Sequence, residues 1–258
     1  MGLEVMRHRD LNPHVSVDCV IFGFDNVDLN VLLIEREEGY IEENANNNAQ
    51  PARGSLALPG DHIREDEKLD QAAARVLKEL TNLDNIFLEQ FHAFGHPNRA
   101  KNEADRQWMK SVRAEPDARV ITVAYFSLVR LEMYNPKASS FAKHAAWFPV
   151  SSIPELAFDH NLIVRRALEA LRNQLKNEPV GFELLPPKFT LSQLRRLYEL
   201  ILGTELEKRN FRRKILKKNF LVPLDEKQKG VPHRAARLFT FDKDKYESFK
   251  TDKYDFSI

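Results

Sequence analysis

The stretch from Leu58 to Leu83, LPGDHIREDEKLDQAAARVLKELTNL, is the part of this 258-residue chain that decides the fold of its N-terminal half. From Leu69 onward, apolar residues recur at helical spacing, which predicts an amphipathic helix with one apolar face. Val76 and Leu80 are four residues apart and therefore share that face. The segment is predicted to pack this face against a core.

The same stretch resembles the Nudix hydrolase signature, GX5EX7REUXEEXGU, in which U is a bulky aliphatic residue. Glu67, Arg75 and Glu79 occupy three of its charged positions, and Asp61 and Asn82 replace its two glycines. The simplest interpretation of the three charged residues is a salt-bridged loop and helix that shape the fold. Residual hydrolysis through Glu79, with a carboxylate from elsewhere in the chain, is the alternative.

Two positions of the signature have lost their carboxylates. Val76 and Leu80 stand where Nudix hydrolases have glutamates. Those enzymes use the cluster to hold Mg²⁺, a hard cation that prefers oxygen ligands and that valine and leucine cannot bind. The resemblance thus implies a Nudix scaffold that is not an enzyme, with no catalytic residue, no metal and no cofactor.

Composition excludes several classes of protein. No run approaches the roughly 20 apolar residues of a membrane helix, and the N-terminus lacks a signal-peptide core. The single cysteine, Cys19, lies in an apolar run and is expected to be a buried thiol. The simple expectation is a cytoplasmic protein that does not associate with membranes.

Charge is distributed unevenly along the chain. The whole chain has a net charge of +1, but residues 184–241 hold 14 Lys and Arg against five Asp and Glu. The remainder must therefore be acidic. A basic C-terminal module on an acidic body suggests that this module contacts a polyanion.

Residue patterns predict an α+β chain with two domains. In the first, β-rich segments at 15–24, 30–35, 86–95, 119–131 and 145–150 accompany the helix above and a second helix at 158–175, while 37–53 is predicted to be a polar loop. This order fits a Nudix-like α/β/α sandwich. We expect this effector-sensing domain at 1–176, a connector at 177–189 and a second domain at 190–258.

The second domain has the plan of a winged helix-turn-helix. Thr190 and Gln193 form a capping box before a helix that ends at Gly203. Thr204 is expected to cap the next helix, which carries the basic stretch Arg209–Lys218. A hairpin with a polar tip at 225–230 and a strand at 237–241 follows.

These placements predict binding to double-stranded DNA. A second, basic helix suits the major groove, with Arg212, Arg213 and Asn210 able to reach base edges. Phosphate contacts are expected from lysines of the same helix and from the wing. The full predicted set is Arg209, Asn210, Arg212, Arg213, Lys214, Lys217, Lys218, Arg234 and Arg237. An RNA- or protein-binding adaptor is the alternative, although the wing lacks the stacking aromatics that single strands prefer.

Nearly the whole chain is similar to the NrtR-type transcriptional regulators, which join a degenerate Nudix domain to a winged helix. The resemblance rests on Ala157–His160, on Phe189–Leu191 and above all on Lys208–Leu216. It implies a dimeric repressor that binds a palindromic operator and releases it when a small molecule enters the Nudix pocket. The arabinose-responsive AraR branch of Bacteroidetes resembles the chain most.

The resemblance implies one of two effectors. These are L-arabinose, as in the AraR branch, or alternatively ADP-ribose, as in NrtR proteins. Loss of the metal-binding carboxylates favours a neutral sugar, which needs hydrogen-bonding side chains and an aromatic face. Candidate ligand-binding residues are Arg36, Asp61, His62, Glu79, Arg119, Trp147 and His160. Core packing, helix capping or surface roles are the alternatives for each.

Overall fold

A computed structural model describes residues 11–36, 55–100, 102–140, 142–177, 181–218, 220–230, 235–242 and 244–245. The predicted polar loop at 37–53 lies outside these ranges. The chain forms two compact units. The first comprises residues up to Phe22 together with Asn30–Ser127 and Tyr134–Ala167, and the second comprises Gly23–Leu29, Leu128–Met133 and the chain from Leu168 onward.

A seven-stranded sheet underlies the N-terminal unit. Its central order is β3-β2-β1-β6-β5, with β4 paired to β1 and β7 paired to β2. The strands are β1 (Leu11–Phe24), β2 (Leu29–Arg36), β3 (Leu56–Ala57), β4 (Gly60–Arg64), β5 (Glu89–Phe94), β6 (Ile121–Arg130) and β7 (Ala142–Pro149). Residues 17–24 of β1 are buried without alternation, because helices cover both faces of the sheet.

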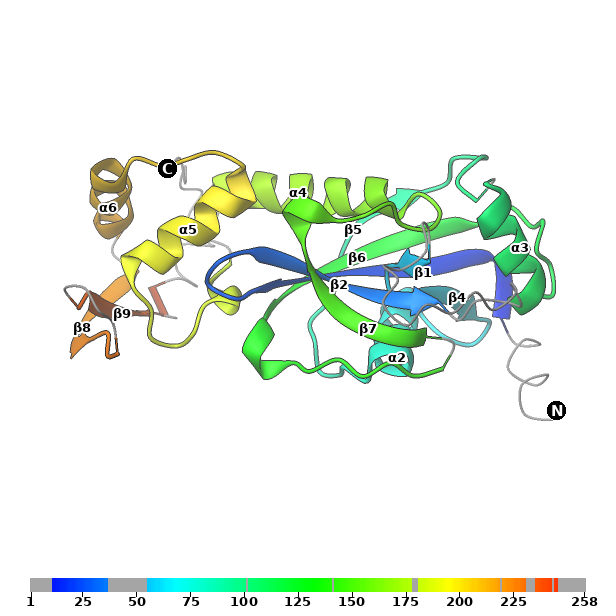
Figure 1. Cartoon of the computed structure of the whole chain (residues 1–258), viewed down its shortest axis with the longest axis horizontal. Coiled ribbons are helices and arrows are strands. Elements are labelled where there is room, and N and C mark those ends of the chain that lie inside the picture. The colour runs from blue at the N-terminus through cyan, green and yellow to red at the C-terminus, as the bar shows by residue number, and fades with distance from the viewer. Residues whose placement is uncertain are drawn as a thin grey trace, which may run out of the picture. The chain divides into compact units, whose positions relative to one another are not determined.

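Among the described residues, this sheet is accompanied by the helices α2 (Leu69–Thr81), α3 (Glu103–Val112) and α4 (His160–Asn177). In Figure 1, α2 lies on one side of the sheet and the first half of α4 on the other, which confirms the predicted Nudix-like sandwich. Short 3-10 turns occupy Leu131–Met133 and Val150–Ser152. Helix α3 and the strands β3 and β4 were not predicted from the sequence.

Helix α2 forms for the reasons that its sequence suggested. Val76, Leu80 and their apolar neighbours are almost fully buried. The helix ends at Asn82, which adopts a left-handed conformation with φ of 57°. Glycine is the residue that most readily adopts this conformation, and asparagine tolerates it. This explains why an asparagine can replace the second glycine of the signature.

The C-terminal unit contains the winged helix. Its elements are a 3-10 turn at Phe182–Leu184, α5 (Leu191–Leu202), α6 (Lys208–Lys217) and the antiparallel strands β8 (Leu221–Lys227) and β9 (Arg237–Phe241). The Thr190–Gln193 capping box and the left-handed Gly203 are confirmed. The prediction that Thr204 caps α6 was wrong. Glu207 is the cap, because both of its carboxylate oxygens accept backbone N–H groups, from Arg209 and Asn210.

Aromatic side chains build the core of the winged helix. Tyr198 of α5 meets Phe211 of α6 edge to face, with ring centroids 5.8 Å apart. Phe182 stacks on Phe241 of β9 at 4.0 Å. The predicted connector therefore contributes a ring to this core. Among the described residues, no helix has the length and apolar character needed to cross a membrane.

Candidate ligand pocket and nucleic-acid interface

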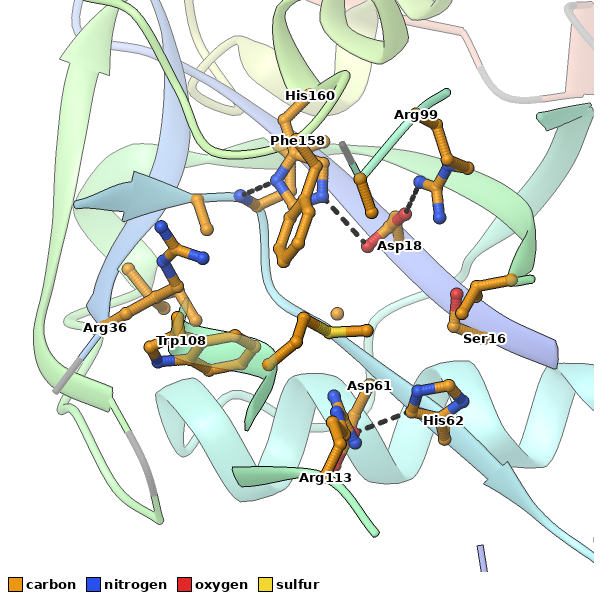
Figure 2. A pocket seen from close by; sticks show the side chains of 17 residues that line it. Ser16, Asp18, Arg36, Asp61, His62, Arg99, Trp108, Arg113, Phe158 and His160 are labelled. Atoms are coloured by element: carbon orange, nitrogen blue, oxygen red, sulfur yellow. Dashed lines mark hydrogen bonds and ion pairs between the residues drawn. The ribbon is translucent and has the colours of Figure 1, made fainter. Parts of the chain in front are cut away.

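A cavity of about 50 Å³ lies within the N-terminal unit. One water needs about 10–15 Å³ of such space, so the cavity has room for a few waters. Figure 2 shows the side chains that line it. The polar and aromatic ones are Ser16, Asp18, Arg36, Asp61, His62, Arg99, Trp108, Arg113, Phe158 and His160.

Asp18 of β1 is the centre of a buried cluster on one side of the cavity. Arg99 donates to Asp18 Oδ2 at 3.3 Å and holds both oxygens of Asp159 at 2.8 and 3.1 Å. Asp18, Arg99 and His160 are each less than a tenth exposed. Gly60 packs against Asp18 so closely that an added Cβ would collide with its Oδ1. A residue with a side chain at position 60 would therefore disrupt this cluster.

His160, the first residue of α4, is held in one tautomer. Its Nδ1 accepts the Leu58 N–H at 2.9 Å, so the proton must reside on Nε2. Nε2 lies 3.5 Å from Asp18 Oδ1. Burial lowers the pKa of His160 and outweighs the nearby carboxylate of Asp18, so the ring is neutral. This neutral ring presents its N–H toward Asp18 at the cavity wall (Figure 2).

A second buried ion pair contributes to the lining. Arg113 donates to Asp61 Oδ1 at 2.7 Å. Beside them, His62 Nδ1 lies 3.2 Å from the Val15 carbonyl, an arrangement that places the proton on Nδ1. Burial, and then the charge of Arg113, lower the pKa of His62 to about 4. His62 therefore lines the cavity as a neutral ring.

Helix α3 contributes an aromatic wall. The guanidinium of Arg36 lies 4.8 Å from the ring centre of Trp108 and 5.1 Å from that of Phe158. Asp105, only 1% exposed, pairs with Arg36 at 3.1 Å and accepts the Phe158 N–H at 2.8 Å. Phe158 has a φ of 54°, which is rare for a bulky residue and often marks a functional site.

The charges around the cavity nearly cancel. Three arginines, Arg36, Arg99 and Arg113, are each paired with a carboxylate. The carboxylates in these pairs are those of Asp18, Asp61, Asp105 and Asp159. The hydroxyl groups of a ligand can therefore bind either the arginines or the carboxylates. An anionic group of a ligand could instead displace a carboxylate from an arginine.

The remnant of the Nudix signature forms a separate, salt-bridged cluster. Arg75 binds Glu67 at 2.5 and 2.9 Å, Glu79 at 2.9 Å and the His62 carbonyl at 3.0 Å. Val76 and Leu80 are 0% and 1% exposed. In the part of the chain that the structure describes, no three His, Cys, Asp or Glu side chains are grouped as a metal site would need.

Four of the seven predicted ligand-binding residues line the cavity: Arg36, Asp61, His62 and His160. The other three do not. Glu79 lies in the Arg75 cluster, Arg119 donates to the Gly95 carbonyl at 3.0 Å, and Trp147 lies on β7 opposite Leu32.

Six lining residues that carry polar or aromatic chemistry were not predicted from the sequence, namely Ser16, Asp18, Arg99, Trp108, Arg113 and Phe158. The ion pairs among them join residues 52 to 81 positions apart, which no local pattern reveals. Phe158 was quoted only as part of a family motif. Its positive φ and the ring of Trp108 beside it became evident only in the structure.

The predicted DNA-binding residues gather on α6. Arg209, Arg212, Arg213 and Lys217 are exposed, and Asn210, Lys214 and Lys218 are partly exposed. Arg213 donates to Asn210 Oδ1 at 2.9 Å, which links two of the three residues expected to reach base edges. In the wing, Arg237 pairs with Asp225 across the hairpin at 3.1 Å. Arg234 lies outside the described residues.

Known protein families match both the N-terminal and the C-terminal part of the chain. Residues 12–171 match the NUDIX domain, and residues 181–241 match the NrtR DNA-binding winged helix domain. The chain is 30% identical over 234 residues to the "ADPR responsive transcriptional repressor NtrR" of Acinetobacter baylyi, covering 89% of this chain and 82% of that protein. The chain belongs to the NrtR family of Nudix-related transcriptional regulators.

Two further proteins are similar to the chain, and the first of them is an NrtR protein. Shewanella oneidensis NrtR, solved in complex with a 27mer DNA, matches with a TM-score of 0.62 at 25% identity, over 90% of this chain and 95% of that one. An ADP-ribose pyrophosphatase of Methanocaldococcus jannaschii is 29% identical over 170 residues, 63% of this chain and 81% of that enzyme. The second of these relatives is an enzyme by name.

Proposed function

We propose that this NrtR-family protein is a transcriptional repressor that binds operator DNA as a homodimer and releases it when ADP-ribose enters the Nudix pocket. The observation that carries the proposal is the presence, in one chain, of a basic winged helix and a Nudix pocket lined by three buried arginines. The Acinetobacter relative supports the choice of ADP-ribose, because its name describes a repressor that responds to this molecule. A dimer would let two recognition helices read the two halves of a palindrome.

The pocket suits a diphosphate that is bound without metal. Arg36, Arg99 and Arg113 can each meet phosphate oxygens in the bidentate manner that guanidinium groups favour. Each would exchange a carboxylate partner for a phosphate. Two metal-binding positions of the Nudix signature are occupied by the buried Val76 and Leu80. We therefore infer that the ligand is sensed and not hydrolysed.

L-Arabinose, the effector favoured by the sequence analysis, is the second candidate. Two observations favour it: the cavity holds only a few waters, and each lining arginine is already neutralised by a carboxylate. A neutral pentose gains hydrogen bonds from such pairs without an unbalanced charge, and Trp108 offers an apolar face. ADP-ribose, by contrast, would require the pocket to open further.

Thermal shift of the full-length protein distinguishes the candidates. ADP-ribose, NAD, L-arabinose and D-ribose are added in turn, and a ligand at 100 times its Kd adds about 2.7 kcal/mol to the free energy of unfolding. We expect ADP-ribose to give the largest shift. A selective response to L-arabinose would replace the proposed effector, and no response to any of them would contradict the sensor function. Mg²⁺-dependent cleavage of ADP-ribose would show that the domain is an enzyme.

A further inference from the structure

Two elements that line the pocket continue into the C-terminal unit. Strand β1 carries Asp18, and the end of this strand belongs, with the turn after it, to the segment Gly23–Leu29 of the unit that contains the winged helix. Helix α4 begins at His160, and its residues from Leu168 onward belong to the same C-terminal unit. Asp18 and His160 contact each other at the cavity wall, with 3.5 Å between Oδ1 and Nε2.

The distal part of α4 holds the end of α5. Arg172 Nε donates to the Ile201 carbonyl at 2.6 Å, one of the last carbonyls of α5, which have no partner within the helix. The guanidinium also lies at the negative end of the helix dipole. Gly203, the left-handed C-cap, leaves room for it, because a Cβ there would lie 3.1 Å from Arg172 Nη2.

The β1–β2 turn holds the same helix from its exposed side. Gln193 Nε2 donates to Asn26 Oδ1 at 2.7 Å, and Arg196 Nε donates to the Val27 carbonyl at 2.9 Å. Asn26 has a φ of 76°, and Asp25 accepts the N–H groups of Val27 and Asp28. The turn is therefore a defined structure that can hold α5 in place.

Helix α5 in turn fixes the recognition helix. Glu199 Oε1 accepts the Leu206 N–H at 2.9 Å, and Arg195 donates to the Leu206 carbonyl at 2.9 Å. These bonds tie the α5–α6 turn to α5. Displacement of the end of α5 must therefore move or loosen α6.

Helix α4 is able to carry a displacement along its length. Ile163, Ala167, Leu171 and Leu175 form an unbroken stripe that is at most 2% exposed. His160 and Arg172 are twelve positions apart, which corresponds to about 18 Å of helix. A helix packed in this way shifts as one piece more readily than it bends.

We propose that α4 and β1, together with the turn after β1, form a linkage that couples the pocket to α5. At the pocket the two elements contact each other through Asp18 and His160. At the other end, α5 is bound to α4 through Arg172 and to the turn through Gln193 and Arg196. A ligand that binds Asp18 or His160 changes the contact between the two elements, and the linkage carries this change to the recognition helix. The proposal rests on the proposed function for the ligand that would use it. Arg172 is then a coupling residue that touches neither ligand nor DNA.

Hydrogen–deuterium exchange of the full chain tests the linkage without ligand or DNA. Asp18→Asn and Asp61→Asn make the same change in two buried Asp–Arg pairs that line the same cavity, but only Asp18 lies on the linkage. We expect Asp18→Asn to speed exchange of the amides at 199–206 about fivefold, the effect of losing one hydrogen bond, while Asp61→Asn leaves it unchanged. Equal effects of the two variants, or none from Asp18→Asn, would overturn the proposal.

The reverse direction provides a second test that does not depend on the folding of the Asp18 variant. Coupling is reciprocal, so Arg172→Ala should speed exchange of the amides at 158–163 and of the Leu58 amide. The control is Arg165→Ala, which removes an exposed arginine of the same helix and should not do so. Identical exchange in both variants would count against the linkage. Because neither test uses an effector, a wrong choice of ligand would leave these results unaffected.

Discussion

At the scale of single residues, the two pocket histidines are neutral and carry their protons on opposite ring nitrogens. His160 accepts a backbone N–H at Nδ1, whereas His62 has its Nδ1 beside a backbone carbonyl. The nitrogen of the His62 ring that is left as an acceptor is therefore Nε2. Each ring's tautomer is fixed by the backbone, so the pattern of donors is set before a ligand enters.

The depressed pKa of His62 predicts that acid destabilises the fold. Its pKa is about 4 in the folded protein and about 6.5 in the unfolded chain, so the unfolded state takes up the proton first as the pH falls. Stability is lost from about pH 6.5 down to about pH 4. Between pH 7.5 and pH 4.5, this residue should cost about 2.5 kcal/mol.

Urea unfolding of the wild type and of His62→Gln at these two pH values measures this contribution. Between pH 7.5 and pH 4.5, the free energy of unfolding should fall more in the wild type than in His62→Gln. Parallel losses in the two proteins would show that His62 is not a source of the pH dependence.

The chemistry of individual residues was only partly predictable from sequence. Arg36 and His160 were named because their residue types suit a polar ligand, and both line the cavity. Asp18 lies in a buried strand between Val17 and Cys19, so its immediate neighbours in sequence do not indicate a polar site. Its partners, Arg99 and Asp159, come from other segments, so only the folded chain reveals the cluster.

At the scale of elements, α2 and the loop before it are joined by Arg75. Replacement by alanine removes bonds to Glu67, Glu79 and the His62 carbonyl. We expect Arg75→Ala to lower the free energy of unfolding by about 2–3 kcal/mol, because Glu67, which is 12% exposed, loses its ion-pair partner. Urea denaturation measures the change.

Arg64→Ala is the matched control for this helix. The side chain of Arg64 binds Glu79 at 3.0 Å and is 44% exposed, so its loss should cost less than about 1 kcal/mol. Comparable losses of unfolding free energy in the two variants would contradict the conclusion that Arg75 joins α2 to the loop before it.

We expect α6, the proposed recognition helix, to contribute to DNA binding and not to effector binding. Arg212→Ala combined with Arg213→Ala should abolish binding of operator DNA, since both exposed guanidinium groups can reach bases or phosphates. Binding of the effector should be unchanged in calorimetry, because both residues lie in the C-terminal unit. Unaltered DNA affinity in this double variant would refute the assignment of α6.

The elements that sequence predicted are those with long apolar periodicity, such as α2, α4 and α5. Helix α3 was missed because its buried side is small. Trp108 and Met109 are adjacent, and the third buried position is a charged residue, Asp105. The ion pair with Arg36 and the hydrogen bond from the Phe158 N–H allow a carboxylate there, and neither helical periodicity nor propensity encodes these contacts.

At the scale of the whole molecule, the separation of charge predicts strongly salt-dependent DNA binding. The logarithm of the affinity should fall linearly with the logarithm of salt concentration, with a slope of about −0.9 for each phosphate neutralised. Lys214→Ala with Lys217→Ala should make this slope shallower by about 2. Lys110→Ala, on α3 of the other unit, should leave it unchanged, and the slopes are obtained by fluorescence anisotropy.

The most direct test of the account is whether a small molecule in the Nudix domain releases DNA from the winged helix. A fluorescein-labelled duplex, selected for binding from a random-sequence pool, is titrated with the full-length protein with and without saturating ADP-ribose. We expect ADP-ribose to weaken DNA binding by about tenfold or more, which corresponds to a coupling free energy of about 1.4 kcal/mol. Unchanged DNA affinity, in a protein that calorimetry shows to be saturated with ADP-ribose, would contradict it.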